Sequence, residues 1–317
     1  MNTKLQYYTN LANEFINTSI SLTKMAKREN TTRQTLARYF KILGFQIVNK
    51  QNRIKFDNSI FDSIDTEEKA YWLGFIFADG YISSTLKNKN RYLLEISLKG
   101  SDKHHLEKFN VFTKHENKNK VSIETSTCKN KKFTRCRWYV ANKHLWEVLN
   151  SYGCTPNKSL TLKFPNKSIF NDPSLIRHFI RGYFDGDGCF TRGIHTNTVS
   201  PIVSFIGTKE FLEEILTYSG IQGQFRHDKR HTELTWILEY NKENGIKLIN
   251  YLYNDSSIYL DRKYKLYNFF KDGSRSIKEF IELLSGNIGE NPINKDNAEI
   301  SSKITKGLET SYSVENE

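Results

Sequence analysis

The octapeptide Arg181-Gly-Tyr-Phe-Asp-Gly-Asp-Gly188 decides the fold, because it closes an apolar segment that the chain contains twice. The earlier copy reads Ala70-Tyr-Trp-Leu-Gly-Phe-Ile-Phe-Ala-Asp-Gly80 and places Asp79 where the later copy has Asp187. Internal duplication indicates that each copy opens one structural unit of the same kind. Both segments are apolar enough to form a buried helix that ends at Asp-Gly.

The chain after each copy repeats one order of expected elements: a β-hairpin, an amphipathic helix, a second hairpin and a final helix. The first hairpin strands are expected at Tyr81–Leu86 and Tyr92–Lys99, and their counterparts at Cys189–Arg192 and Val199–Ile206. The amphipathic helices are expected at Asp102–Val111 and Lys209–Ser219. Each copy then reaches a turn that carries a lysine, Lys158 in the first and Lys263 in the second.

Small residues recur at helical spacing inside both segments. Gly74 and Ala78 are four residues apart, as are Gly182 and Gly186, so each pair forms a helix face without bulky side chains. Such faces allow two helices to pack backbone to backbone. Aromatic and aliphatic residues around them are expected to anchor each helix in its own half: Trp72, Phe75, Ile76, Phe77, Phe179, Ile180, Tyr183 and Phe184.

Asp79 and Asp187 follow these small residues at the ends of the expected helices. A close crossing there brings two carboxylates together, and because like charges repel, the arrangement predicts divalent cations between them. For one Asp-Gly after an apolar helix, a simple helix-ending turn is the alternative interpretation. Two copies with small-residue faces favour the metal site.

Composition and charge narrow the choice of partner. The 317 residues carry a formal net charge of +12 with a pI near 9.3. Residues 1–270 hold +15 and residues 271–317 hold −3, so the basic character lies in the part expected to fold. No apolar run approaches the ~18 residues of a membrane helix, and Met1–Asn10 lacks the apolar core of a secretion signal. We therefore expect a cytoplasmic protein that binds nucleic acid and no membrane.

At these residues the chain resembles the LAGLIDADG homing endonucleases, in the single-chain form with two pseudo-symmetric halves. The nine-letter motif is kept at Gly74, Ile76, Ala78, Asp79 and Gly80, and again at Gly182, Asp185, Asp187 and Gly188. Departures are Phe77, where the first motif often has Asp, and Leu73 and Arg181, where Ala is usual. The resemblance covers about residues 57–270. It implies an α+β fold with two αββαββα halves that form an antiparallel β-saddle over DNA.

The resemblance implies a site-specific double-strand DNA endonuclease that hydrolyses phosphodiester bonds with Mg2+. It places two or three ions, with Mn2+ as a substitute, at Asp79 and Asp187, beside the backbone carbonyls of Ala78 and Gly186. Lys158 and Lys263 are the candidates for stabilising transition-state charge, with Lys99 as a weaker third. Plain phosphate contacts are the alternative role for these lysines. Because both halves lie in one chain, a monomer is expected.

The beginning of the chain carries a helix-turn-helix signal. Leu22–Glu29 and Thr32–Lys41 read as short helices about a turn at Asn30, whose side chain tolerates a positive φ. Ala26 permits close approach of the helices, and Leu36 and Tyr39 are expected to face inward. The outward face would carry Arg33, Gln34, Thr35, Arg38 and Lys41. These side chains suit a major groove, and an ordinary basic helical hairpin is the alternative.

Four regions are therefore expected: a helix-turn-helix-like segment and linker (1–56), a first half (57–164), a second half (165–275), and a short helix with a polar tail (276–317). DNA readout falls to polar side chains of the strands and loops. In the first half these are Ser83, Thr85, Lys87, Asn88, Arg91, Arg135 and Arg137. In the second half they are Arg192, His195, Asn197, Thr198, Gln224, Arg226 and Arg230. For any one of them, a merely solvated side chain is the alternative.

Two other functions fit the same pattern. A non-cutting transcription regulator would use the same fold and the helix-turn-helix, although such a protein need not keep both Asp79 and Asp187. An RNA maturase that assists intron splicing would also use a basic saddle, because folded RNA presents the same phosphate charge.

DNA binding is expected to weaken steeply between about 50 and 200 mM salt, because phosphate neutralisation by the basic region releases condensed counterions. Residues 271–317, which carry a net charge of −3, should add nothing favourable to the free energy of DNA binding. Titration of a labelled duplex at several salt concentrations measures the slope. A flat dependence would show that the +15 charge of residues 1–270 does not face DNA.

Overall fold

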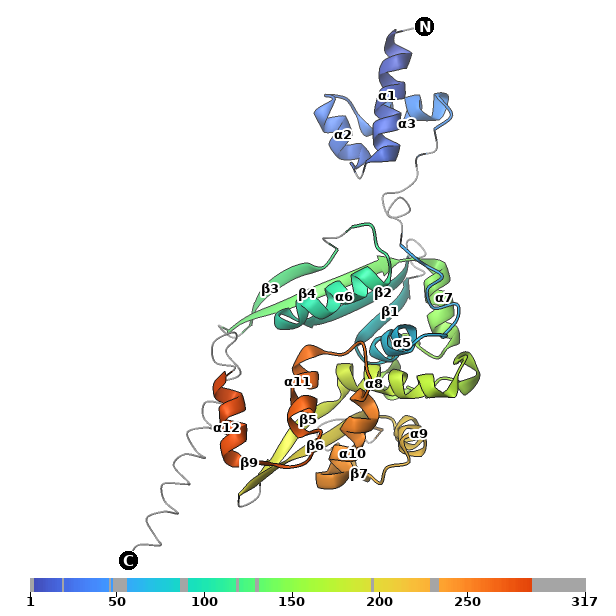
Figure 1. The fold of residues 1–317 in the computed structure, drawn as a ribbon. Helices are drawn as coiled ribbons and strands as arrows, with labels where there is room; N and C mark the ends of the chain where they lie inside the picture. Colours follow the sequence, from blue (N-terminus) through green and yellow to red (C-terminus); the bar gives the residue numbers. More distant parts are fainter. Residues whose placement is uncertain are drawn as a thin grey trace, which may run out of the picture. The chain divides into compact units, whose positions relative to one another are not determined.

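The computed structural model of the protein describes residues 3–18, 20–45, 47, 56–85, 91–117, 120–128, 131–194, 197–228 and 234–286 (Figure 1). Four residues predicted to contact DNA lie outside this range: Lys87, Asn88, His195 and Arg230. The side chains of Thr85 and Arg91 are also outside the described part. The chain divides into two compact units, Met1–Ser63 with Asp79–Pro156 and Ile64–Ala78 with Asn157–Glu317.

Two series of elements follow the order αββαββα, apart from short 3-10 turns (Figure 1). The first contains α5 (Glu67–Asp79), β1 (Gly80–Thr85), β2 (Arg91–Lys99), α6 (Lys103–Phe112), β3 (Ser122–Cys128), β4 (Lys131–Ala141) and α7 (Lys143–Ser151). The second contains α8 (Ile176–Asp187), β5 (Cys189–Ile194), β6 (Thr198–Gly207), α9 (Lys209–Ser219), β7 (Gln224–His227), β8 (Trp236–Asn241) and α10 (Lys242–Tyr253). This order confirms the predicted α+β fold with two copies of one unit.

Each series builds one antiparallel sheet, with strand order β1-β2-β4-β3 in the first and β5-β6-β8-β7 in the second. Alternate strand residues face the helices: Ile96 pairs with Trp138, Phe205 pairs with Leu238, and all four are fully buried. Helices α6 and α7 contact the first sheet, and α9 and α10 contact the second. The core therefore lies on one face of each sheet, and the opposite face carries the polar strand residues.

The end of the second unit differs from its predicted form. Lys263 lies in helix α11 (Asp261–Phe270) and not in a turn. A short strand β9 (Arg275–Ser276) then pairs with β6 as a fifth strand, which the sequence did not predict. The expected short helix follows as α12 (Ile277–Gly286). Its start is a capping box, in which the backbone N–H groups of Ser276 and Glu279 bond to each other's side chains.

The segment before α5, which was predicted to open the first half, belongs in part to the core. Ile60, Phe61 and Ile64 are buried. Tyr152 donates its hydroxyl to the carbonyl of Phe61 at 2.8 Å. The apolar side chains of this stretch are therefore anchors, which its polar composition concealed.

Three helices precede that segment: α1 (Thr3–Asn17), α2 (Leu22–Arg28) and α3 (Arg33–Ile42). Helices α2 and α3 lie where they were predicted, and Asn30 between them has the expected positive φ of 50°. Helix α1 was not predicted, although its buried residues follow a helical period: Tyr8, Leu11, Ala12 and Phe15. The prediction that Tyr39 faces inward was incomplete, since Phe40 is the fully buried aromatic residue of α3.

Helices α5 and α8 cross backbone to backbone, as the small residues predicted. A Cβ added at Gly74 would lie 1.9 Å from the carbonyl oxygen of Phe179. A Cβ added at Gly182 would lie 1.9 Å from the carbonyl oxygen of Tyr71. Because of this contact, residues 64–78 fall in one compact unit with α8, although the predicted first half includes them.

We expect Gly182→Ala or Gly74→Ala to destabilise the protein by more than about 3 kcal/mol. Alanine would gain up to about 1 kcal/mol in helix propensity. That gain is outweighed because the new methyl group meets rigid backbone, and overpacking commonly costs about 1–3 kcal/mol even against side chains. Urea unfolding of each variant measures the change.

Gly220→Ala is the matched control in the same unit. Gly220 ends α9 with a φ of +63°, and a Cβ there would meet nothing within 4 Å. That variant should lose only about 1–2 kcal/mol, the cost of a left-handed alanine. Equal losses in Gly182→Ala and Gly220→Ala would contradict the close crossing.

Candidate active site and nucleic-acid interface

Helix α8 ends at Asp187, one of the two predicted metal ligands. Gly188 follows as the C-cap, and its N–H donates to the carbonyl of Phe184 at 2.9 Å. The Asp187 side chain keeps contact with solvent, although surrounding protein raises the pKa of its carboxyl by desolvation. The positive charges of Lys158 and Lys263 act in the opposite direction. The end of α8 is therefore an anionic position with two ammonium groups in electrostatic range.

Lys158 lies at the end of α5. It begins the 3-10 turn Lys158–Leu160 directly after Asn157, which has a φ of 58°. Its ammonium donates to the carbonyl oxygen of Ala78 at 3.2 Å, and its side chain is half-buried. Ala78 is followed by Asp79, the last residue of α5, and both are half-buried. A cation thus already contacts one of the carbonyl oxygens predicted to bind metal.

Lys263, the other predicted catalytic lysine, contacts the end of α8. It is buried, and its ammonium donates to the carbonyl oxygens of Phe184, of Asp185 at 3.1 Å and of Gly188 at 2.5 Å. Carbonyl groups in the last turn of a helix lack helical partners, and a lysine can satisfy them. Lys263 therefore caps α8 on both sides of Asp187.

Asp185, another motif residue, is fully buried and is an internal acceptor. It accepts hydrogen bonds from the hydroxyl of Tyr71 at 2.7 Å, the hydroxyl of Tyr253 at 2.5 Å and the N–H of Leu260 at 2.7 Å. Burial raises the pKa of this carboxyl, and the charge of Lys263 lowers it. Helices α5, α8 and α10 therefore meet at one buried carboxyl group, which fixes the turn that carries Asp187.

Arg181, the departure from the family motif, forms a second buried network. Its guanidinium contacts Glu67 and Nδ1 of His178, both at 2.6 Å, and the carbonyls of Leu252 and Ile258, both at 3.1 Å. A buried guanidinium must have such partners, because an unpaired charge costs several kcal/mol, on the order of 3–5. The sequence marked Arg181 as unusual but held no signal for the distant partners Glu67, Leu252 and Ile258.

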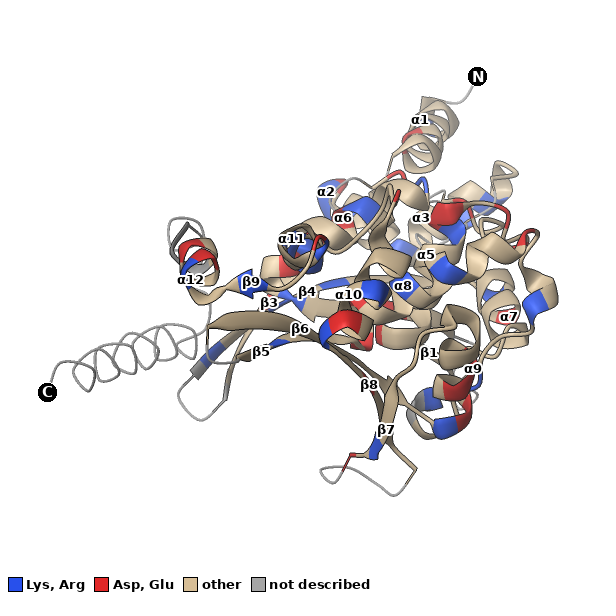
Figure 2. Cartoon of the chain, turned by 60° about the horizontal axis from the view of Figure 1, so that its bottom comes forward, with Lys and Arg blue, Asp and Glu red and all other residues tan. Residues whose placement is uncertain are grey.

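One face of the first sheet carries paired charges from β2, β3 and β4. Figure 2 marks the Lys and Arg residues of the chain in blue and the Asp and Glu residues in red. Arg137 pairs with Glu95 at 2.5 Å and with Glu124 at 3.6 Å, and Arg135 pairs with Glu124 at 2.6 Å. Cys136, between the two arginines, is buried on the helix side. The strand pleat therefore places Arg135 and Arg137 on the polar face, where they were predicted to contact DNA.

Other residues of this polar face follow from the strand register. Tyr81 of β1 and Tyr139 of β4 are exposed, and both are cross-strand partners of Glu95 on the central strand β2. Ser83, a predicted contact, is half-buried on the same face of β1, and Lys99 stands opposite Arg135. The two tyrosines were missed, although Tyr139 is two residues from Arg137 on β4 and Tyr81 is two residues from Ser83 on β1. Sequence alternation would have found them.

The second sheet has a similar polar face. Gln224 and Arg226 are exposed on β7, and Arg226 pairs with Glu239 of β8 at 3.1 Å. Ser204 of β6 stands opposite both Glu239 and Cys189. The predicted contacts Gln224 and Arg226 thus lie on one strand face. Asn197 and Thr198 are exposed at the start of β6.

Arg192 is not on this polar face, contrary to its predicted role as a strand contact to DNA. It is two residues from Phe190, whose ring lies 6.2 Å from that of Phe270 on the helix side. Its guanidinium lies over the ring of Phe280 in α12, 4.8 Å from the ring centre, and burial lowers its pKa. The opposite face of β5 carries Cys189 and Thr191, which are exposed.

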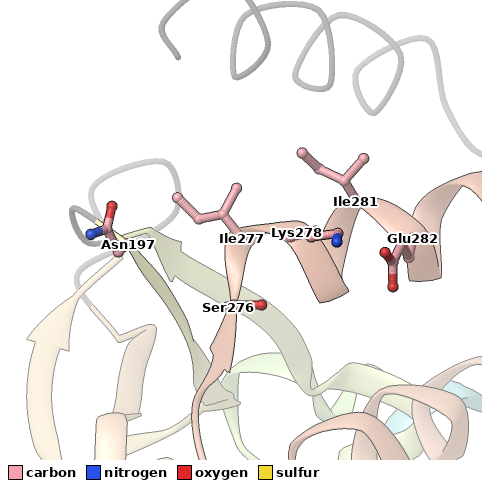
Figure 3. Close-up of a pocket in the computed structure, with 6 residues that line it drawn as sticks. All are labelled: Asn197, Ser276, Ile277, Lys278, Ile281 and Glu282. Atoms are coloured by element: carbon pink, nitrogen blue, oxygen red, sulfur yellow. The ribbon is translucent and has the colours of Figure 1, made fainter. Parts of the chain in front are cut away.

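A pocket of about 480 Å3 lies beside α12 (Figure 3). Its described lining is Asn197, Ser276, Ile277, Lys278, Ile281 and Glu282. The pocket holds neither motif aspartate, so it is separate from the predicted active centre. Within the described residues, no helix is long and apolar enough to cross a membrane.

In the part of the chain that the structure describes, no group of three or more His, Cys, Asp and Glu side chains is placed to hold a metal ion. Magnesium at phosphoryl-transfer sites usually binds one or two carboxylates and completes its shell with water and substrate oxygens. Asp79 and Asp187, with the carbonyls of Ala78 and Gly186, are donors of this kind.

No protein-family model matches the chain, and no curated protein matches it. Among solved structures, the chain is similar to the LAGLIDADG homing endonuclease I-GzeII in complex with its DNA target, at 18% identity and a TM-score of 0.43, over 74% of this chain and 96% of that one. It is similar to I-SmaMI bound to cleaved DNA, at 13% identity and a TM-score of 0.44, over 62% and 85% of the two chains. Variants of the homing endonuclease I-DmoI are 18% identical with a TM-score of 0.38, over 62% and 90%. Identities this low assign no residue role here.

The protein is expected to lose stability as pH falls from about 6.5 to 4, because of His178. Burial and the charge of Arg181 lower the pKa of His178 to about 4, although Glu67 acts against them. In this window the unfolded chain takes up a proton that the folded protein does not, so each pH unit costs up to about 1.4 kcal/mol. Urea unfolding at pH 7, 6 and 5 measures the slope.

His178→Gln should flatten that slope, since an amide keeps an acceptor for Arg181 but does not titrate. His104→Gln is the control, because His104 is exposed. His115, whose pKa burial also lowers, contributes equally to the wild type and both variants. An unchanged slope in His178→Gln would show that another group causes the pH dependence.

Proposed function

We propose that the protein is a site-specific double-strand DNA endonuclease that hydrolyses phosphodiester bonds with divalent cations. One observation carries the proposal: two motif helices of a duplicated αββαββα unit contact each other through Gly74 and Gly182, and each helix ends in an aspartate, Asp79 or Asp187. A structural duplication alone would not need an acid at both ends. Carboxylates in equivalent places suit a reaction on two strands.

The proposed metal ligands are the carboxylates of Asp79 and Asp187 and the carbonyl oxygens of Ala78 and Gly186. They are hard oxygen donors at C-terminal helix ends, where the helix dipole adds negative potential, so they suit Mg2+, with Mn2+ as a substitute. The Lys158 ammonium donates to the Ala78 carbonyl oxygen, so a metal ion bound there would share this donor with the lysine or displace it. Divalent ions bound there would supply water activation and charge neutralisation at the phosphate.

Lys158 is the proposed catalytic lysine. Its half-buried side chain lies at the helix end that carries Asp79, where an ammonium would stabilise charge that develops on a phosphate oxygen. Lys263 is left out of the catalytic set, because its ammonium is buried against three carbonyl oxygens. Its proposed role is to hold the end of α8 in place.

The polar faces of the two sheets are the proposed DNA surfaces. Arg135, Arg137 and Arg226 supply guanidinium groups, which bind phosphates or the edges of guanine, and Gln224 suits adenine. Glutamate partners orient these guanidinium groups on the strands, and such exposed ion pairs change the stability of the protein little. Because both motifs lie in one chain, we propose that a monomer is the active form.

Asp187→Asn and Asp79→Asn are expected to lower the rate of DNA cleavage by about 100-fold or more, because each removes a ligand charge without changing size. Affinity for the uncut duplex should change little. The measurement is cleavage of a target selected from a plasmid library, with Mg2+ or Mn2+, beside binding of the same duplex in EDTA.

Asp255→Asn is the matched control, since Asp255 is exposed and its φ of 54° is one that asparagine also tolerates. It should cut like the wild type. Wild-type activity in Asp187→Asn would refute the metal assignment. A wild-type protein that binds the duplex but never cuts would instead be a transcription regulator, and a preference for folded intron RNA would indicate a maturase.

A further inference from the structure

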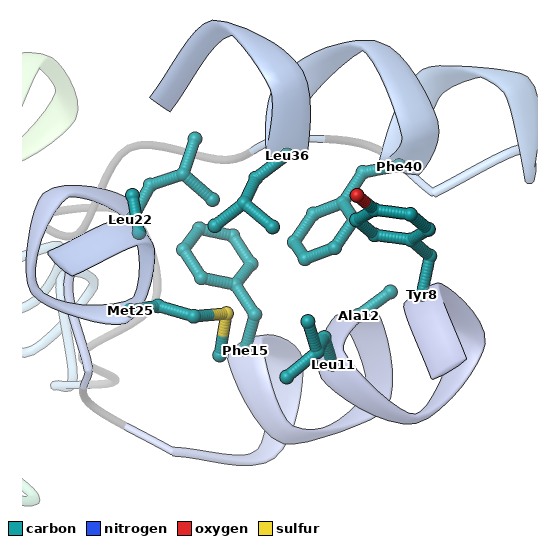
Figure 4. Close-up of a cluster of buried hydrophobic side chains, with 9 residues drawn as sticks. Tyr8, Leu11, Ala12, Phe15, Leu22, Met25, Leu36 and Phe40 are labelled. Atoms are coloured by element: carbon teal, nitrogen blue, oxygen red, sulfur yellow. The ribbon is translucent and has the colours of Figure 1, made fainter. Parts of the chain in front are cut away.

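The first three helices form a small folded body with its own core (Figure 4). The core side chains come from all three helices: Tyr8, Leu11, Ala12, Phe15, Leu22, Met25, Ala26, Leu36 and Phe40. Four of them, Ala12, Met25, Leu36 and Phe40, are fully buried. Helix α1, which the sequence did not predict, thus supplies the surface on which α2 and α3 pack.

Polar contacts fix the angle between these helices. Arg28 of α2 makes two bonds of 2.6 Å to the carboxylate of Glu14 in α1, and a third of 2.6 Å to Glu29. Tyr7 of α1 donates its hydroxyl to Glu29 at 2.5 Å. Ser21 and Thr32 cap α2 and α3, each accepting a backbone N–H at 3.1 Å. Helix α3 is held to α1 by apolar packing, which includes the stacked rings of Tyr8 and Tyr39 with centres 3.8 Å apart.

The exposed face of α3 lies opposite its buried Leu36 and Phe40. Gln34, Arg38 and Lys41 are exposed and spaced as i, i+4 and i+7, so they share this face. The predicted contact Arg33 is exposed at the first turn of α3. Ile42, which is 64% exposed, lies beside Arg38 and Lys41 on the same side of the helix. Two cations, an amide and an exposed apolar group are the side chains that read phosphates, adenine or guanine edges and thymine methyl groups.

Charge on this body favours an anionic partner. Residues 1–45 contain seven basic and two acidic residues, a formal charge of +5. Both acids, Glu14 and Glu29, bond to Arg28 within the body. Helix α3 contains no acidic residue in its sequence. The basic face of α3 therefore carries no compensating carboxylate of its own helix.

We propose that this three-helix body is a second DNA-reading module, which inserts α3 into the major groove beside the DNA bound by the sheets. The proposal deepens the proposed endonuclease function by lengthening the sequence that the protein recognises. An α-helix fits into the major groove of B-form DNA, whereas the deep and narrow major groove of A-form RNA excludes it.

The chain limits where this second contact can lie. Phe45 and Phe56 are eleven residues apart in the sequence. A chain spans at most about 3.3–3.6 Å per residue, so the two ends lie no more than about 36–40 Å apart. At about 3.4 Å per base pair this is roughly 11 base pairs, or one turn of the double helix. The recognised flank should therefore begin within about one turn of the central site.

The experiment compares two duplexes in binding to the full-length protein, without metal. One holds only the selected central site, and the other adds the roughly 15 base pairs that flank this site on each side in the selected plasmids. This length is about one and a half turns of the double helix, slightly more than the reach of the linking chain. The wild type should bind the long duplex about 10-fold more tightly or better, with hydroxyl-radical protection on one flank. The triple variant Gln34→Ala, Arg38→Ala, Lys41→Ala should bind both duplexes equally and lose that flank protection.

Lys143→Ala with Lys209→Ala is the matched control, because it also removes two exposed positive charges, at the starts of α7 and α9. It should keep the preference for the long duplex. The proposal is overturned if the wild type shows no preference and no flank protection, or if the triple variant keeps both. Stronger competition by structured RNA than by the long duplex would also overturn it.

Failure of the endonuclease proposal gives a different result. A protein that protects the flank but never cuts in Mg2+ or Mn2+ would keep the second module and lose only the cleavage assignment. A protein that cuts the short and long duplexes equally well, with no flank protection, would keep the endonuclease and lose the module.

Discussion

The contact between the backbones of α5 and α8 is the constraint on which the proposed active centre depends. Gly74 and Gly182 approach the carbonyl oxygens of the opposite helix so closely that a methyl group would have no room at either position. The contact is nearly symmetric, because a Cβ added at either glycine would lie 1.9 Å from a carbonyl oxygen of the opposite helix. Aromatic rings then close around it, as in the pair Phe77 and Phe179 at 5.2 Å. Once this crossing is set, each motif helix has only one position for its last residue.

Buried polar and charged groups, besides apolar packing, hold the end of α8 in place. Asp185 and Lys263 are buried, and every hydrogen bond described for them goes to a neighbouring helix, to the loop before α11 or to the end of α8 itself. Removing one partner would leave a buried charge uncompensated, which costs more than the pair contributes when intact. Such networks permit one arrangement and penalise all others. The carboxylate of Asp187 is therefore presented by a turn with little freedom, as a metal ligand requires.

The sheets and the N-terminal body combine charge with geometry in different ways. On the first sheet, Arg135 and Arg137 are paired with Glu124 and Glu95, which adds little stability at an exposed surface but orients the guanidinium groups. In the N-terminal body the acids pair with Arg28 between the helices, and the basic residues of α3 stand on the outer face. Basic residues thus join α1 to α2 in one place and form an exposed contact surface on α3 in another. Position on the helix decides which role each plays.

The sequence by itself determined the duplication, the αββαββα order within each copy, and the helix crossing, because these depend on local periodicity and on glycines four residues from another small residue. It also indicated α2, α3 and the positive φ of Asn30. The strand period of two already indicated the side of β5 on which Arg192 lies. Arg192 is two residues from Phe190, so the two side chains point to the same face of the sheet. Only the tertiary structure decided that Arg181 pairs with Glu67, 114 residues away, and that Lys263 caps α8. Those contacts join residues whose separation carries no periodic signal, and only folding brings each buried charge to the carbonyl and side-chain groups that satisfy it.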